Sequence, residues 1–367
     1  MKKINWKAII GWTVGVALFL GIIGYNAYQN EKKSEHTFII HALAPLSGPF
    51  SVYAKEYKKA FDLAQKEIDT KYGAGKIKIE MEDSQGNPTT AVNIYQQKIK
   101  GNKNRAMILL YSATAKALEP LMDGTMVSSV VAATLPGIAK PEKHLYQITL
   151  TLKDMLASIH KYIEKKNIKT ASVVYINDDY GVEGLRQFKA GFKALGGKII
   201  DEIPYDVTER DVRLQILKAF EHNPEMFWVI GYGSNSYNIL NQLVSLDYKG
   251  LIMTDYSYAW PGFYKMNPEL AKYILTVSPV ETEDFQKKYK PLGMDVIGGA
   301  PILDSALVIA EAYMKCQGDV AKMDDYIMNL KDYNGAYGIW SMRPTGDIYL
   351  PTQVMRWGDG ELVPVEN

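Results

Sequence analysis

The sequence lacks several features that would indicate particular classes of protein. It contains a single cysteine, Cys316, so it can form neither an internal disulfide nor a cysteine-rich zinc site. Its five histidines include no pair at the helical spacing of metal ligands. An excess of one charge is also missing, because 42 Lys and Arg face 41 Asp and Glu. We therefore expect no metal, no cofactor and no nucleic acid among its partners.

The usual enzymatic signatures are missing as well. Residues 73–76 resemble a phosphate-binding loop only in composition, because the full spacing and the Ser or Thr after the lysine are absent. The neighbouring acids Asp178 and Asp179 point in different directions along a loop, and we interpret them as a loop cap rather than an acid–base pair. We predict that the protein is not an enzyme.

Residues 1–33 contain a long apolar run. Residues 9–25 carry no charge and follow Lys2, Lys3 and Lys7, which is typical of an export signal or a membrane anchor. A cleavable signal needs small residues before the cut, where this sequence has Tyr25 and Asn26. We predict an uncleaved hydrophobic helix whose basic start stays in the cytoplasm. The rest of the chain is then expected in the periplasm or at the outer face of the cytoplasmic membrane, anchored by residues 9–25.

From residue 37 onward, short apolar runs alternate with longer amphipathic ones. The runs of strand length lie at 38–43, 77–81, 107–111, 129–133, 172–176, 198–203, 226–230, 250–253 and 273–277. Helical spacing occupies 52–71, 89–100, 152–166, 182–195, 212–222, 236–246 and 300–316. This alternation predicts an α/β fold with right-handed crossovers and mainly parallel sheets. The number of strands favours two doubly wound lobes over one very wide sheet.

The residues that follow the predicted strands suggest a binding site, because ligands bind beyond the carboxyl ends of parallel strands. In the first half of the chain these ends carry the hydroxyls of Ser112 and Thr134, which with backbone N–H groups suit a carboxylate. In the second half, Asp255 can accept hydrogen bonds from an ammonium group and balance its charge. Tyr180 or Tyr232 can add a ring face or a hydroxyl. Any one of them alone is more typical of a helix cap. Together they predict a site for a zwitterion.

Several motifs occur in an order and spacing that is specific as a set. They are Pro45-Leu46-Ser47-Gly48-Pro49 with Tyr53 following, Glu82-Asp83-Ser84-Gln85-Gly86-Asn87-Pro88 leading to Ala91, Ser112 eight residues before Pro120, Ala132-Ala133-Thr134, Asp179-Tyr180-Gly181, Gly231-Tyr232-Gly233, and Gly335 to Gly346-Asp347. In these motifs residues 37–351 resemble the substrate-binding proteins of ATP-driven importers, in the group that includes the bacterial leucine/isoleucine/valine-binding proteins.

The resemblance implies two α/β lobes that are joined by three crossings and close on a ligand. Lobe 1 would comprise residues 37–148 plus 279–338, and lobe 2 residues 149–278 plus 339–367. Ser112, Ala133 and Thr134 would hold the carboxylate and part of the ammonium group. Tyr180 and Tyr232 would close over the ligand from lobe 2, with Tyr53 beside its side chain.

This sequence departs from the family pattern at two places. Tyr256 stands where the branched-chain proteins have a glutamate for the ammonium group, and Asp255 lies one position earlier. Tyr111 precedes Ser112 where many relatives have glycine, which would narrow the pocket. An aromatic cluster at 256–263 suits either a bulky ligand or packing between the lobe and its own loop.

We therefore expect a solute-binding protein that captures a small carboxylate-bearing ligand, in the first place an amino acid, and delivers it to the permease subunits of an ABC importer. The alternative is a sensor that feeds a separate signalling partner. Aliphatic amino acids, aromatic acids, amides and small peptides all remain open as ligands.

Overall fold

The computed structural model describes residues 37–102 and 104–365. The predicted hydrophobic helix therefore lies outside the described residues. Within the described part of the chain, no helix is both long enough and apolar enough to cross a membrane.

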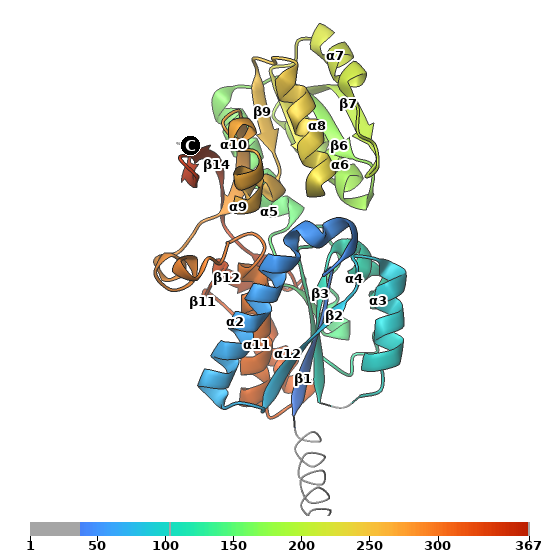
Figure 1. Ribbon diagram of the computed structural model, residues 1–367, viewed down its shortest axis with the longest axis vertical. Coiled ribbons are helices and arrows are strands. Elements are labelled where there is room, and N and C mark those ends of the chain that lie inside the picture. Colours follow the sequence, from blue (N-terminus) through green and yellow to red (C-terminus); the bar gives the residue numbers. More distant parts are fainter. Residues whose placement is uncertain (1–36, 103, 366–367) are drawn as a thin grey trace, which may run out of the picture.

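Two large sheets and one small sheet organise the described part of the chain (Figure 1). The first large sheet is parallel, in the order β2-β1-β3-β4-β5, with strands β1 (Phe38–Ala44), β2 (Ile77–Asp83), β3 (Arg105–Leu110), β4 (Ser128–Val131) and β5 (Leu145–Gln147). The second has the order β15-β14-β10-β9-β8-β6-β7, with strands β6 (Thr170–Ile176), β7 (Lys198–Tyr205), β8 (Met226–Ile230), β9 (Leu251–Thr254), β10 (Ile274–Pro279), β14 (Thr352–Gly358) and β15 (Glu361–Pro364). Only β14 and β15 run antiparallel to their neighbours in it. The small sheet contains β11 (Tyr333–Gly335), β12 (Gly338–Met342) and β13 (Ile348–Tyr349).

Helices connect and cover the strands. Those beside the first sheet are α2 (Ala54–Tyr72), α3 (Pro88–Ile94), α4 (Ser112–Leu118), α11 (Ala300–Cys316) and α12 (Val320–Met328). Those beside the second are α5 (Leu152–Lys166), α6 (Asp179–Ala194), α7 (Arg213–Glu221), α8 (Gly233–Ser245), α9 (Pro261–Met266) and α10 (Pro268–Ala271). In Figure 1, α2 and α11 lie together on one side of the first sheet, and α3 and α4 lie on the other. Every residue of β3 and of β8 is buried, as expected for strands covered on both faces. The predicted α/β fold with parallel sheets is confirmed.

The chain passes between the two large sheets in three places. The first passage follows β5 and the second follows β10. The predicted lobe boundary after residue 338 would separate Trp340 from Asp304 of α11, although Trp340 Nε1 donates a hydrogen bond to the Asp304 carboxylate at 2.9 Å. Asp347 also bridges to Gln147 of β5. We therefore propose that the third passage lies at residues 350–351, immediately before β14.

Candidate functional site

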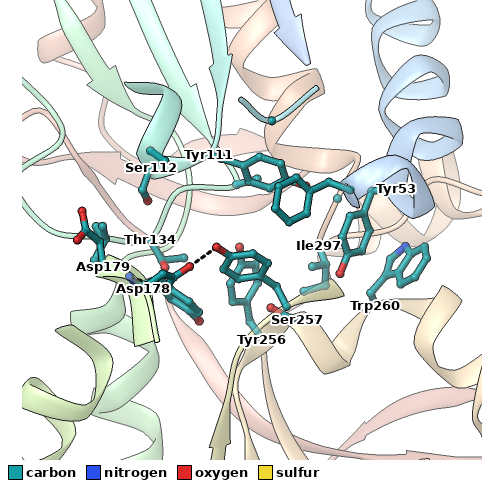
Figure 2. Close-up of a pocket in the computed structure, with 18 of the residues that line it drawn as sticks. Tyr53, Tyr111, Ser112, Thr134, Asp178, Asp179, Tyr256, Ser257, Trp260 and Ile297 are labelled. Carbon is teal, nitrogen blue, oxygen red and sulfur yellow. Dashed lines mark hydrogen bonds between the residues drawn. The ribbon is translucent and has the colours of Figure 1, made fainter. Parts of the chain in front are cut away.

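A cavity of about 360 Å³ lies where the carboxyl ends of the parallel strands of the two large sheets face each other (Figure 2). The first sheet contributes Ser112 after β3 and Thr134 after β4. The second contributes Tyr180 after β6, Tyr232 after β8 and Tyr256 after β9. The topology thus brings together side chains that are up to 144 positions apart in the sequence.

Of the eight residues that we proposed for the site, six line this cavity: Tyr53, Ser112, Thr134, Tyr180, Tyr232 and Tyr256. Two do not line it. Ala133 is buried beside Thr134, with 1% of its surface exposed. Asp255 is fully buried behind the cavity wall.

Asp255 is already occupied by donors of its own lobe, so the expectation that it meets a ligand's ammonium group does not fit its position. One carboxylate oxygen accepts hydrogen bonds from the Tyr180 hydroxyl at 2.9 Å and the Gly231 N–H at 2.8 Å, and the other accepts one from the Ser257 N–H at 2.8 Å. Burial raises the pKa of Asp255 to about 6, and these donors oppose that rise. Asp255 therefore fixes Tyr180 and the loops after β8 and β9.

Polar groups gather at one end of the cavity. Figure 2 shows Ser112 and Thr134 on the same side as Asp178 and Asp179. Asp178 caps α6, because its Oδ1 accepts the backbone N–H groups of Tyr180 and Gly181 at 2.9 and 3.0 Å. Its Oδ2 accepts a hydrogen bond from the Tyr232 hydroxyl, which is the dashed line in Figure 2. The sequence analysis interpreted Asp178 as a loop cap and did not place it in the cavity wall.

Aromatic side chains form the rest of the wall. Phe50 lies 5.0 Å from the ring of Tyr111 and 5.6 Å from that of Tyr232, measured between ring centroids. Tyr53 and Trp260 meet edge to face at 4.7 Å toward the opposite end from Ser112. Tyr111 lines the cavity, and the narrowing that we expect from it stays a prediction.

Tyr180 and Tyr232 of this wall donate their hydroxyls to carboxylates, whereas two other lining tyrosines pair with each other. The hydroxyls of Tyr57 and Tyr111 lie 2.9 Å apart. Burial raises the pKa of both groups well above the ordinary value of about 10, so both stay neutral at physiological pH. These aromatic rings therefore give the cavity an apolar surface, and the hydroxyls of Tyr57 and Tyr111 bond each other.

The aromatic cluster at 256–263 contains residues that line the cavity and residues that pack inside the second half of the protein. Tyr256 and Trp260 line the cavity. Tyr258 and Phe263 are fully buried and pack on Tyr237 of α8, at centroid distances of 5.5 and 4.9 Å. Two residues of this segment thus line the cavity, and two others pack against α8.

Several lining residues escaped sequence reasoning. Tyr57 lies one helical turn after Tyr53, so its position on the same face of the chain was a usable signal. Phe50 directly follows the first of the motifs quoted above. Ile297 and Gly298 belong to the loop before α11, where no periodic pattern indicates an approach to the cavity.

Contacts across the cavity join the two halves. The Tyr53 hydroxyl lies 2.9 Å from the Tyr237 hydroxyl and accepts a hydrogen bond from the Gly233 N–H at 3.1 Å. Lys116 of α4 forms an ion pair with Asp179 of α6 at 2.6 Å. Both partners of that pair are largely exposed, so it contributes little to closure. Within the described ranges, no three His, Cys, Asp or Glu side chains gather as metal ligands would.

A family model described as periplasmic binding protein matches residues 40–361. Among curated proteins, Leu/Ile/Val-binding protein homolog 6 of Brucella abortus is 23% identical over 177 residues, which is 47% of this chain and 45% of that protein. The chain thus spans about half the length of the curated relatives it matches.

Solved structures with similar folds cover 90% of this chain. The leucine-binding protein LivK of Thermotoga maritima has a TM-score of 0.80 at 19% identity, and 98% of that chain is covered. A solute-binding protein of an R. palustris ABC transporter, in complex with 4-hydroxybenzoate, has a TM-score of 0.79 at 18% identity, and 96% of that chain is covered. At such identities the likeness concerns the fold. Since the family model extends over most of the sequence, the chain belongs to the periplasmic binding protein family.

Proposed function

We propose that the protein captures a small carboxylate-bearing ligand, in the first place an amino acid, outside the cytoplasm and delivers it to the permease subunits of an ABC importer. The observation that carries the proposal is a cavity built from two sheets, with hydroxyls at one end and aromatic rings along the rest. Such a wall fits a ligand with a polar head and an apolar body. We infer binding and not catalysis, because the family consists of substrate-binding proteins.

Ser112 and Thr134 are the groups that we propose for the carboxylate. Both line the polar end of the cavity, and neither lies beside a basic side chain in the cavity wall. Hydroxyl donors can take the place of water around a carboxylate when it leaves solvent. Tyr53, Tyr111 and Trp260 are the groups that we propose for the apolar body.

Capture follows from contacts that exist only in the closed form. A ligand that touches Ser112 and Thr134 of one half and Tyr180 and Tyr232 of the other favours closure by its differential affinity for that form. The closed form is then recognised by a membrane partner. We also propose that residues 9–25, outside the described residues, keep the protein at the outer face of the membrane. A sensor would bind in the same way but would not stimulate ATP hydrolysis by importer subunits.

Thermal unfolding and titration calorimetry with a set of L-amino acids and aromatic carboxylates test the proposal. We expect at least one amino acid to raise Tm and to bind with measurable heat. The double variant Ser112→Ala, Thr134→Val should weaken that binding at least tenfold, because each hydrogen bond to a charged group contributes roughly 1.5 to 3 kcal/mol. The exposed Ser245 of α8 supplies a matched control, Ser245→Ala. Absence of any Tm shift across the set would refute the proposal.

A further inference from the structure

The charged side chains that line the cavity are all acidic. Asp178 and Asp179 line it, and no Lys, Arg or His among the described residues does so. Asp179 is exposed and has Lys116 as a partner at 2.6 Å. Among the described residues Asp178 has no cationic partner. The negative charge of Asp179 is therefore balanced by a side chain, and that of Asp178 is not.

Every group that bonds Asp178 within the described chain is uncharged. Its carboxylate receives two backbone N–H groups of α6 and the hydroxyl of Tyr232. The side chain is only partly exposed to solvent. A carboxylate that loses water without gaining a cation carries an electrostatic cost, and a cation placed beside it would offset that cost.

The surroundings of Asp178 favour a cation further. The rings of Tyr180 and Tyr232 lie 5.7 Å apart at the same end of the cavity, and ring faces attract a positive charge. Asp255, by contrast, is fully buried outside the wall and is already bonded to Tyr180, Gly231 and Ser257.

We propose that Asp178 is the counterion for a positively charged nitrogen of the ligand and makes the pocket select carboxylates that carry an amine over the same carboxylates without one. The inference rests on the proposed function, and it assigns to Asp178 the role that we expected for Asp255. An aromatic or aliphatic acid without an amine would bring its own negative charge beside Asp178 and leave that acid uncompensated.

Two ligand pairs test this selection: L-leucine with 4-methylpentanoate, and L-phenylalanine with 3-phenylpropanoate. We expect the wild-type protein to bind the amine-bearing member of at least one pair roughly 10- to 100-fold more tightly, as expected for hydrogen bonds to a charged group. Asp178→Asn keeps an effective helix cap but removes the charge, so it should reduce this ratio to near one, both by weakening the amino acid and by ending the repulsion of the acid without an amine. Asp206→Asn, at an exposed acid of the same lobe, should leave the ratio unchanged.

The outcomes separate the inference from the function on which it rests. If the wild type prefers the amino acid and Asp178→Asn keeps that preference, the counterion role is wrong while the proposed function stands. Equal wild-type binding of both members in every pair that binds also overturns the counterion role and again leaves carboxylate capture intact. Binding of none of the four compounds, nor of any other amino acid, overturns both. If Asp178→Asn does not fold, Asp178→Ser serves instead, because serine is an equally good cap.

Discussion

At the residue scale, Asp295 is a buried acid that lies just behind the cavity wall. Its Oδ1 accepts the Ile297 N–H at 3.0 Å and also the Gly298 N–H, whereas its Oδ2 has no hydrogen-bond partner in the described chain. Burial raises the pKa of Asp295 to about 6 from 3.8, with the backbone donors opposing the rise and Glu56 adding to it. Such a group prefers to be protonated in the folded state.

We predict that Asp295→Asn stabilises the protein at pH 8 but not at pH 4. Between about pH 4 and 6 the folded wild type retains a proton that the unfolded chain has released, so its free energy of unfolding falls as the pH rises through this interval. The charged form then costs up to about 3 kcal/mol, which the amide avoids. Thermal unfolding of both proteins across pH 4 to 8 measures the difference. A gain that does not change with pH, or a similar gain in Asp62→Asn on the exposed face of α2, would contradict this account.

The roles of individual residues were only partly predictable from the sequence. The hydroxyls and tyrosines after the strands could be assigned to one site because the direction of parallel strands places their ends together. The choice between Asp178 and Asp255 could not be made in this way. It depends on which carboxylate is buried behind Tyr180 and which faces the cavity, and both acids follow a strand in the same manner.

At the scale of elements, the apolar runs predicted nine strands that coincide with β1 to β4 and β6 to β10. The predicted helices 152–166 and 300–316 match α5 and α11 in both bounds. Strand β5 was missed because three residues do not show a period, and α4 was missed because its small residues form no apolar stripe. The β-strands after residue 332 were also missed, because most of them are too short to show a period.

The junction of β6 with α6 depends on a glycine. A Cβ at Gly181 would lie 1.9 Å from the backbone oxygen of Ile176, which cannot move without disturbing β6. We predict that Gly181→Ala costs about 1 to 3 kcal/mol of stability because the first turn of α6 must shift, taking Asp178 and Tyr180 with it. Urea unfolding measures this cost. Gly358→Ala, whose Cβ would meet Val363 at an ordinary 3.6 Å, should change stability far less, and an equal loss in both variants would show that close packing at α6 is not the cause.

At the scale of the whole molecule, Tyr53 connects the two halves of the protein. It lies beside the first sheet, yet its hydroxyl bonds Tyr237 and Gly233 of α8 beside the second. Periodicity in the sequence predicts each half but not the angle between them, because that angle depends on contacts between residues about 180 positions apart. The place that we propose for the third passage, at residues 350–351, depends on a long-range contact in the same way, since Trp340 is bonded to Asp304.

We predict that Tyr53→Phe favours the open form. Loss of one or two hydrogen bonds should weaken ligand binding by about 3- to 30-fold and increase the radius of gyration of the ligand-free protein. Calorimetry and small-angle X-ray scattering measure the two effects. Tyr237→Phe is the matched control, because it leaves the Gly233 N–H to Tyr53 bond in place and should have a smaller effect. Identical scattering and affinity in all three proteins would mean that other contacts set the closed form.

A cavity with walls from two separate sheets has a consequence for how such a protein diversifies. Its selectivity depends on the match between two surfaces, and that match changes whenever the segments joining the sheets alter their relative orientation. Substitutions in those segments, remote from any bound solute, can therefore retune which compounds are accepted. Two proteins with this architecture can then differ in ligand preference while every wall residue stays the same.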